Sequence, residues 1–383
     1  MSEKKQYENE TRSGSAVKRW LYAGFGALIL SLIIIYLARI DAVNRFMGTA
    51  DEVGKAQQAT EQIEAARKEF LQTSDALSVD NSISGLNIPT DPEGFFAPPN
   101  ESEIPDNEFG DSIIRGREIF LNPGANATAF VGNSLACANC HLNAGQQAHS
   151  APMWAAAGMY PTYRGKNKKI NTMEDRVNGC FTYSMNAPNS PSGGPPPEGH
   201  QIYKDLESYF HWMATGAPNR VDLPGSGYPE LDEPEAGYDA GRGEKVFETQ
   251  CAVCHGDEGQ GRQDMNGRYV FPPLWGPNSY NWGAGMHRVN TAAGFIYANM
   301  PLGLPFSLTE QEAWDVAAYI NSHERPADPR QPDEELSVAQ AAEHYHDHKC
   351  YYNKEVQGHV IGKGVSADPE AVPSSTGTVV PEH

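Results

Sequence analysis

The stretch CANCH at residues 137–141 decides the fold of this 383-residue chain, because it returns as CAVCH at residues 251–255. Both have the form C-x-x-C-H, in which two thiols bond covalently to haem and the histidine binds its iron. One match alone also suits a redox dithiol or half a zinc site. Two matches, each between two predicted helices, favour two covalently bound haem c groups. The predicted attachment residues are Cys137, Cys140, His141, Cys251, Cys254 and His255, with both histidines as iron ligands.

The composition agrees with a fold organised around such cofactors. Glycine and proline number 37 and 28, which indicates long loops around a packing centre rather than a helix-dense core. The formal net charge of −20 excludes a general affinity for nucleic acid. We therefore expect a mainly α protein with two tandem class I cytochrome c domains and an N-terminal transmembrane helix.

The transmembrane helix is predicted from residues 20–38 (WLYAGFGALILSLIIIYLA), which are apolar, uncharged and about long enough to cross a bilayer. Lysines and arginines precede this segment, which favours a cytoplasmic N-terminus and export of the rest. A cleaved signal peptide is the alternative, but the apolar run is long and no A-x-A site follows it. We expect a single-pass protein of a bacterial inner membrane, with both haem domains in the periplasm.

Periodicity and linker composition divide the chain into six parts. Helices are predicted at 112–121 and 201–215 in the first haem domain, and at 240–250 and 309–322 in the second. The predicted parts are 1–48, the cytoplasmic N-terminus and anchor; 49–107, an amphipathic helix at about 49–77 and an extended linker or strap; 108–216, cytochrome c domain 1; 217–237, a linker; 238–325, cytochrome c domain 2; and 326–383, a polar, irregular tail that is disordered at its end.

The sixth iron ligands are predicted from methionine and cysteine positions. Met300 precedes a proline on the loop into the last helix, the usual place of the distal methionine in a class I cytochrome c. Met265 and Met286 lie too early in the loop region. In the first domain Met185 has nearly the same spacing from its histidine as Met300, but Cys180 competes with it, and spacing leaves both open.

Cys180 itself has three interpretations: a disulfide with Cys350, an inert buried thiol, or a thiolate bound to haem iron. Five positive charges lie between Arg164 and Arg176 in an otherwise acidic chain. Nearby cations favour the thiolate form of cysteine and attract small anions. The third interpretation, together with an anion site, is therefore favoured.

The region from about 109 to 330 resembles the dihaem thiosulfate dehydrogenases, a family that includes tetrathionate reductases. The resemblance rests on LACANCHLNAG (135–145), MYPTYR (159–164), EDRVNGCFTYSMNA (174–187), CAVCHGDEGQG (251–261) and FPPLWGPNSYNWGAGMHRVNTAAGFIYANMPLG (271–303). It implies that Cys180 is the distal ligand of haem 1 and lies in the active site. It also implies substrate contacts from Arg176 and Ser184, and a further basic contact from Arg164 or Lys166.

Two positions depart from the family pattern. Tyr183 stands where many relatives have a basic residue, which bears on turnover. Asn299 stands where some relatives have a lysine able to replace methionine on haem 2, which favours constant His/Met ligation by His255 and Met300.

The expected function is the oxidation of two thiosulfate ions to tetrathionate, or the reverse, at a His/Cys-ligated haem. Electrons would pass through a His/Met-ligated haem to a soluble cytochrome c, another small carrier or a membrane complex. Two dianions about 4 Å apart repel by on the order of 15 kcal/mol at an effective dielectric near 20. Cationic side chains, and a covalent step at Cys180 that admits the ions one at a time, offset this repulsion. The alternative is a membrane-anchored dihaem electron carrier, or a subunit of a respiratory or photosynthetic complex, without sulfur-substrate turnover.

The tail carries alternate histidines and a cysteine, His344, His346, His348 and Cys350. This pattern suits a metal site. On an irregular tail, however, it favours an ordinary cluster of surface side chains.

Overall fold

The structure, a computed structural model, describes residues 88–165, 168–265, 269–331 and 338–365, with positions 58, 61, 62, 64, 65 and 68. The chain divides into two units, Met1–Glu64 and Ala65–His383. The isolated positions from 58 to 68 are helical and exposed, and the rest of the predicted helix at 49–77 lies outside the described residues. So does the predicted segment at 20–38. Within the described residues, no helix has both the length and the apolar character needed to cross a bilayer.

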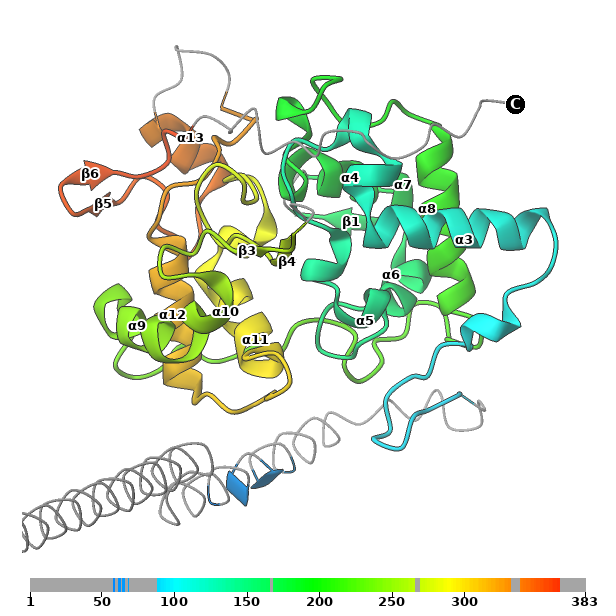
Figure 1. Cartoon of the computed structure of the whole chain (residues 1–383), viewed down its shortest axis with the longest axis horizontal. Coiled ribbons are helices and arrows are strands. Elements are labelled where there is room, and N and C mark those ends of the chain that lie inside the picture. Colours follow the sequence, from blue (N-terminus) through cyan, green and yellow to red (C-terminus); the bar gives the residue numbers. More distant parts are fainter. Residues whose placement is uncertain are drawn as a thin grey trace, which may run out of the picture. The chain divides into compact units, whose positions relative to one another are not determined.

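The first haem domain is built on two helices that pack against each other, α3 (Glu108–Leu121) and α8 (Gln201–Met213) (Figure 1). The Asn107 side chain caps α3 by accepting hydrogen bonds from the amides of Phe109 and Gly110, so the helix begins before the predicted residue 112. Between these helices lie α4 (Pro123–Asn126), α5 (Leu142–Gly145), α6 (Met153–Met159), the hairpin of β1 (Thr162–Arg164) and β2 (Lys169–Asn171), α7 (Met173–Gly179) and the π-helical segment η5 (Cys180–Ser184).

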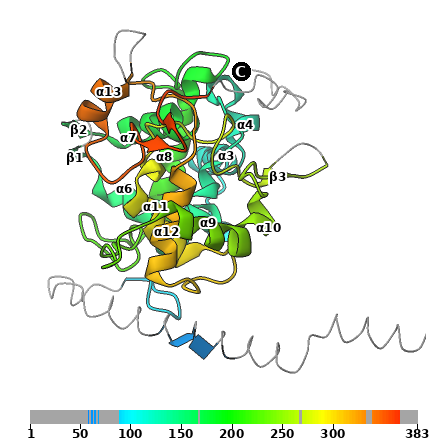
Figure 2. The same cartoon turned by 90° about the vertical axis from the view of Figure 1, so that its left-hand side faces the viewer.

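The second haem domain repeats this plan with α9 (Ala240–Val246) and α12 (Glu310–Asn321), as Figure 1 and, from the side, Figure 2 show. Thr309 and Glu312 form a capping box at the start of α12, close to the predicted boundary. Both predicted helices of this domain are confirmed. Its other elements are the π-helical segment η7 (Phe247–Cys251), α10 (Ala252–His255), β3 (Arg262–Gln263), β4 (Tyr269–Phe271), η8 (Gly285–His287) and α11 (Val289–Asn299).

In both domains the first and last helices meet at a glycine. A Cβ atom on Gly116 of α3 would lie 2.0 Å from the backbone oxygen of Asp205, and one on Gly243 of α9 would lie 1.9 Å from that of Asp315. The same aspartates accept salt bridges from the arginine that precedes each glycine, Arg115 at 2.9 Å and Arg242 at 2.7 Å. In each domain, the same pair of features therefore fixes the close helix contact: a glycine at the crossing point and the arginine–aspartate salt bridge next to it.

This contact gives a stability prediction. The Gly243→Ala substitution should lower the thermal midpoint of the holoprotein by about 10 °C or more, because overpacking against backbone costs about 1–3 kcal/mol. Circular dichroism during thermal denaturation measures the change. The control is Gly241→Ala on the same helix, where the nearest atom is a side-chain oxygen of Asp239 at 3.3 Å; it should move the midpoint by no more than about 4 °C. Equal midpoints for the two variants would contradict the packing argument.

The described part of the linker before α3 lies over the first domain as a strap. Phe95 and Phe96 are buried, and the Phe96 ring lies 5.2 Å from the ring of Trp154 on α6. The short turn η2 (Glu101–Glu103) follows. Residues 217–237, predicted to be a linker, contain no helix or strand. Their backbone is nevertheless tied to the first domain, since the carbonyls of Gly225 and Gly227 accept from the amides of His149 and Ala151.

Amide side chains join the π-helical segment η5 to the second domain. The Asn281 side chain donates to the carbonyl of Thr182 at 2.9 Å, and its backbone amide donates to that of Tyr183 at 3.2 Å. The Asn133 side chain donates to the carbonyls of Ser184 at 2.7 Å and Ser279 at 3.1 Å. These bonds hold the segment that begins with Cys180 in one position between the two domains.

The prediction of an irregular tail is wrong for residues 338–365. This part forms α13 (Val338–Tyr345) and the hairpin of β5 (Glu355–Val356) and β6 (His359–Val360). Its buried residues Ala341, Cys350, Tyr352 and Ile361 pack with Trp282 of the second domain into a small separate core. The polar composition hid this packing because the buried residues are few: Ala341 is the buried residue of α13, and Cys350, Tyr352 and Ile361 lie outside the helix and strands. Residues 366–383 lie outside the described residues.

Candidate functional site

Each C-x-x-C-H motif presents its histidine in the geometry that an iron ligand requires. The Nδ1 atom of His141 lies 2.8 Å from the carbonyl oxygen of Ala151, and that of His255 lies 2.9 Å from the carbonyl of Pro272. A carbonyl only accepts, so Nδ1 carries the proton and Nε2 is left as the ligand atom. Burial lowers the pKa of His141 to about 4 and also lowers the pKa of His255, which keeps both rings neutral. The motifs therefore suit haem attachment and proximal ligation.

A cavity of about 350 Å³ adjoins the first motif. Cys137, Cys140 and His141 line it, and so do residues of α6, α7 and the π-helical segment η5. Most of the lining is apolar, as a porphyrin requires, and Arg176 is a charged lining residue that contacts Cys180. The residues that line this cavity include Phe120, Leu135, Met153, Tyr160, Arg176, Val177, Cys180, Phe181, Ser184, Met185, Leu206, Phe210 and Tyr280.

Cys180 enters this cavity at the point where α7 changes into the π-helical segment. A capping box between Thr172 and Asp175 starts α7, so Arg176 falls one turn before Cys180. The Arg176 Nη1 atom donates a hydrogen bond to Cys180 Sγ at 3.0 Å. The Cys180 sulfur raises the pKa of the Arg176 guanidinium and outweighs the opposing effect of burial. The charged guanidinium of Arg176 therefore faces the sulfur of Cys180 directly.

Arg164 lies in the same polar network through Tyr160. The Arg164 Nη1 atom donates to the Tyr160 hydroxyl at 2.6 Å, and Tyr160 also hydrogen-bonds Arg176. Arg164 is therefore linked through one phenol to Arg176, which contacts Cys180, but Arg164 is not among the residues that line the cavity. Lys166, the other predicted basic contact, lies outside the described residues. Lys169 does not join the network, since it is exposed and pairs with Asp175 at 3.0 Å.

Ser184 and Tyr183 are neighbours with different surroundings. Ser184 lines the cavity, and its predicted contact with substrate stays a prediction. The Tyr183 ring packs instead beside Gly283 of the second domain and under the guanidinium of Arg330, whose carbon lies 5.2 Å from the ring centroid. Tyr183 thus occupies the contact between domains.

The structure bears on two alternatives to Cys180 as an iron ligand: a disulfide with Cys350, and Met185 as the ligand instead. Cys180 and Cys350 are both free thiols, so the structure contains no disulfide between them. Met185, the alternative ligand, also lines the cavity but is 2 % exposed and belongs to the apolar core. Cys180 is the one of the two whose sulfur accepts a hydrogen bond from a cation. The identity of the ligand stays a prediction.

In the second domain, Met300 follows α11, and its side chain is partly buried against the second core. Its neighbour Asn299 is 2 % exposed and bridges the domains: its side chain accepts from Gln147 at 2.8 Å and donates to the carbonyl of His149 at 3.0 Å. A lysine could not make both bonds. Met265 is 98 % exposed.

Sequence reasoning missed two tyrosines of the site. Tyr160 stands four residues before Arg164 in the quoted MYPTYR segment, and its spacing from a basic run was the available signal. Tyr228 lies in a Pro/Gly-rich linker that carries no such signal. Burial raises the pKa of Tyr228 well above its usual value, and Cys140, Arg176 and Cys180 act on it electrostatically. Both phenols therefore lie close to the predicted ligand.

Comparison with known proteins agrees with this geometry. The family "SoxA/TsdA, cytochrome c domain" matches residues 127–218, and the family "Cytochrome c" matches residues 240–324. Two relatives called thiosulfate dehydrogenase, from Stutzerimonas stutzeri and Thiomonas intermedia, are each 48% identical; the alignments cover 71% and 73% of this chain and 87% and 86% of theirs.

A solved structure described as thiosulfate dehydrogenase (TsdBA) from Marichromatium purpuratum aligns with a TM-score of 0.67 and 48% identity. The alignment covers 71% of this chain and 58% of that chain. Two cytochrome c domains with intact attachment motifs indicate two covalently bound c-type haems. The chain belongs to the thiosulfate dehydrogenase family.

Proposed function

We propose that this protein is a thiosulfate dehydrogenase, which oxidises two thiosulfate ions to tetrathionate or catalyses the reverse reaction. The observation that carries the proposal is the hydrogen bond from Arg176 to the Cys180 sulfur, inside a cavity lined by a haem-attachment motif. When bound, the haem of each domain supplies one-electron redox chemistry, and electrons leave through the second domain. Their acceptor is a soluble cytochrome c, another small carrier or a membrane complex.

Arg176 and Arg164 would neutralise the charge of the substrate. Arg176 and Arg164 are joined through Tyr160, so both guanidinium groups act on one small volume. Guanidinium groups make paired hydrogen bonds to sulfonate-like oxygens and are always charged. They bind and orient a thiosulfate with its sulfane sulfur toward Cys180. We assign further substrate contacts to Ser184, which lines the cavity, and to Lys166.

Cys180 provides a covalent route that keeps the two dianions apart in time. The Cys180 thiolate bonds to the sulfane sulfur of one thiosulfate, and two electrons are released, which leaves Cys180–S–S–SO₃⁻. The second thiosulfate attacks that sulfane sulfur, forms tetrathionate, and returns Cys180 as a thiolate. Charge and atoms balance in both steps. We also assign Cys180 and His141 as the residues that would bind the iron of the first haem, which would accept the electrons when it is bound.

We propose His255 and Met300 as the two iron ligands in the second domain. Two hydrogen bonds from Asn299 to the first domain support this assignment, because they fix the residue before Met300. Position 299 is also not a lysine, so it offers no amine that could replace the Met300 sulfur on the iron. We further propose that residues 20–38 anchor the protein in a bacterial inner membrane with its N-terminus in the cytoplasm and its haem domains in the periplasm. The apolar length of that segment and the preceding basic residues support this location.

An assay of the full-length holoprotein tests the function. Thiosulfate and an artificial electron acceptor are supplied, and tetrathionate is measured as the product. We expect tetrathionate in a 1:2 ratio to thiosulfate consumed, with the acceptor reduced in step. The proposal would be contradicted if small electron donors reduced the haems but the protein neither formed tetrathionate from thiosulfate nor reduced tetrathionate to thiosulfate. That result would favour the electron-carrier alternative.

The ligand assignment in the second domain gives a separate prediction. The Met300→Ala substitution should remove the long-wavelength absorption band of methionine-ligated ferric haem and lower the reduction potential of one haem, because a thioether favours the reduced iron. Absorption spectroscopy and a redox titration measure both effects. Met265→Ala is the control, because Met265 is almost fully exposed. A Met300→Ala spectrum equal to that of the wild type would contradict the assignment.

A further inference from the structure

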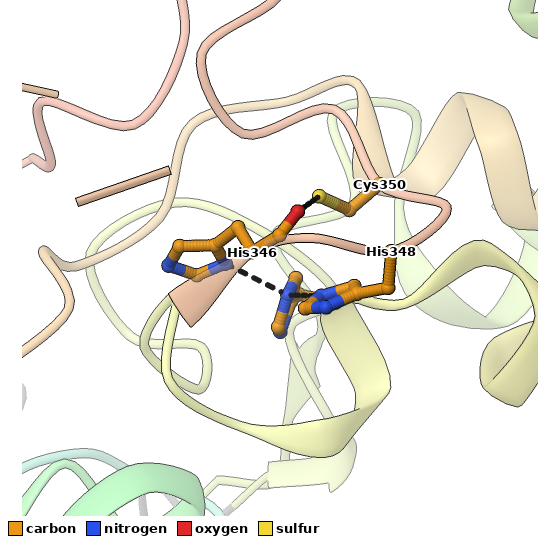
Figure 3. Close-up of side chains that lie close together, drawn as sticks. His346, His348 and Cys350 are labelled. Atoms are coloured by element: carbon orange, nitrogen blue, oxygen red, sulfur yellow. Dashed lines mark hydrogen bonds between the residues drawn. The ribbon is translucent and has the colours of Figure 1, made fainter. Parts of the chain in front are cut away.

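Three histidines and one cysteine meet on the side of the second domain that carries the tail. The ligand atoms of His287, His346, His348 and Cys350 all lie within 4.8 Å of one another. Figure 3 shows the tail residues His346, His348 and Cys350 close together. His287 Nε2 lies 2.6 Å from His348 Nε2 and 3.0 Å from His346 Nδ1. We call these four residues the His₃Cys cluster.

The cluster is buried, contrary to the prediction of a group of surface side chains. His287, His346 and Cys350 are 1 %, 5 % and 5 % exposed. His344, the first histidine of the tail pattern, is exposed and lies outside the cluster. His287 takes its place from η8, a position far away in the sequence. Only the folded tail brings the four ligands together.

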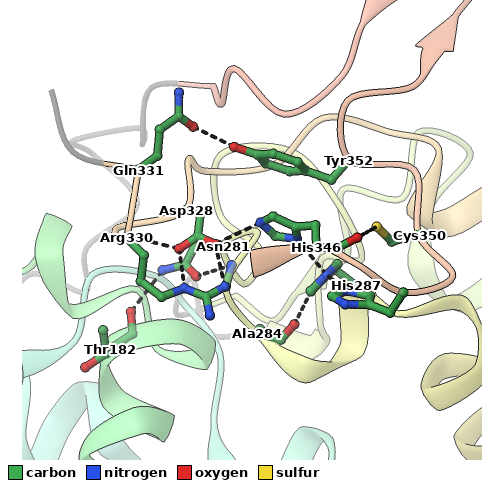
Figure 4. Close-up of polar contacts among 12 residues, drawn as sticks. Thr182, Asn281, Ala284, His287, Asp328, Arg330, Gln331, His346, Cys350 and Tyr352 are labelled. Carbon is green, nitrogen blue, oxygen red and sulfur yellow. Dashed lines mark hydrogen bonds and ion pairs between the residues drawn. The ribbon is translucent and has the colours of Figure 1, made fainter. Parts of the chain in front are cut away.

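In His287 and His346, the ring nitrogen that faces away from the cluster already makes a hydrogen bond. His287 Nδ1 contacts the carbonyl of Ala284, and His346 Nε2 lies 2.9 Å from a carboxylate oxygen of Asp328 (Figure 4). Carbonyl and carboxylate oxygens accept hydrogen bonds, so each ring donates outward and directs a lone pair inward. This arrangement, in which an outer acceptor fixes the tautomer of each histidine, is typical of metal-ligating histidines.

Inward lone pairs only 3.0 Å apart repel each other unless a cation lies between them. An extra proton on His346 is one such cation, but Asp328 already has a balancing charge in Arg330, which contacts it at 2.6 Å. A single metal ion would bind the ring nitrogens that face the centre of the cluster together with the Cys350 sulfur.

The backbone of the tail is built to present these ligands. From residue 346 to 350 the burial alternates: His346, His348 and Cys350 point inward, and Asp347 and Lys349 are exposed. Lys349 in turn forms an ion pair with Glu233 and lies over the Trp314 ring, with its Nζ 5.2 Å from the centroid. The whole segment is held against the second domain.

We propose that the His₃Cys cluster is a structural zinc site. Three imidazole nitrogens and one thiolate are borderline-soft ligands, and four protein ligands complete a tetrahedral zinc ion with no open position. The surrounding core has few apolar residues, Trp282, Ala341, Cys350, Tyr352 and Ile361. Such a small core needs an additional cross-link. The zinc ion supplies it by fastening the tail to the second haem domain.

The site also lies next to the contact between domains. Asp328 joins the cluster to Arg330, whose guanidinium carbon is 4.5 Å from the centroid of the Tyr345 ring and 5.2 Å from that of Tyr183. Tyr183 belongs to the π-helical segment that begins with Cys180. Zinc binding therefore stabilises the tail residues that pack against this segment. Its role is positioning and not chemistry at the sulfur site.

The test uses the full-length holoprotein, purified without a metal-affinity tag and passed through gel filtration after incubation with ZnCl₂. Elemental analysis is expected to find about one zinc for every two irons. X-ray absorption at the zinc edge should show about three nitrogen neighbours near ~2.0 Å and one sulfur near ~2.3 Å. Cys350→Ser and His348→Ala should each lose most of the zinc and keep both haems. His344→Ala, a histidine of the same tail, should keep the zinc.

Two results would overturn the proposal: zinc content no higher in the wild type than in the Cys350→Ser/His348→Ala double variant, or a zinc shell without sulfur. If the variants do not accumulate, a chelator applied to the wild type decides. Removal of zinc should then expose the tail to trypsin at Lys354, and readdition should restore protection. Tail cleavage that is equally slow with and without the chelator overturns the cross-link.

Discussion

The Cys180→Ala variant is expected to lose thiosulfate oxidation by at least about 10³-fold in kcat, with both haems still attached. Removal of a nucleophile that divides a difficult reaction into two steps commonly costs this much or more. Here it also removes the thiolate partner of Arg176 at 3.0 Å. Initial rates of tetrathionate formation measure the loss, and a haem assay verifies that two haems remain.

The matched control is Met185→Leu in the same cavity. Met185 is buried in the first core, and leucine preserves its apolar volume, so we expect activity within about threefold of the wild type. The spectrum of the oxidised protein separates the two candidate ligands. Thiolate features should vanish in Cys180→Ala and persist in Met185→Leu. The opposite pattern, or full activity in Cys180→Ala, would remove Cys180 from both of its assigned roles.

Arg176→Ala is expected to lower kcat/KM for thiosulfate by about 10²–10³-fold. This range corresponds to the cost of truncating one partner of a buried, hydrogen-bonded charge pair. Arg176→Lys keeps the charge but loses the forked geometry, so it should fall between the alanine variant and the wild type. The kinetics should show a raised KM as well as a lowered kcat, because Arg176 acts on both the substrate charge and the Cys180 thiolate.

Lys169→Ala is the control for general electrostatic attraction. Lys169 belongs to the same basic run, but its side chain is 58% exposed and pairs with Asp175. Surface pairs of this kind contribute about 0–1 kcal/mol. We expect kcat/KM to change by less than about threefold at moderate ionic strength. A larger loss in Lys169→Ala than in Arg176→Ala would show that the basic run attracts thiosulfate by its net charge and that Arg176 has no specific contact.

The sequence by itself determined the parts of this protein that depend on neighbouring residues. The two C-x-x-C-H motifs identify both haem attachment sites, because the chemistry needs only five consecutive residues. The helices before and after them follow from local periodicity and caps, such as the Thr309–Glu312 box of α12. The basic run near Cys180 indicated an anion site because its residues are close neighbours in the sequence. Arg176, the last of them, lies one helical turn before the cysteine.

Only the tertiary structure decided which distant residues share a site. Tyr160 joins two arginines that the sequence showed only as members of one basic run, and Asn299 bonds to Gln147 and His149 of the first domain. His287 replaces His344 in the tail cluster and turns a weak pattern into a buried group of four ligands. Contacts between residues far apart in the chain depend on how complete elements pack, and local spacing carries no information about that packing.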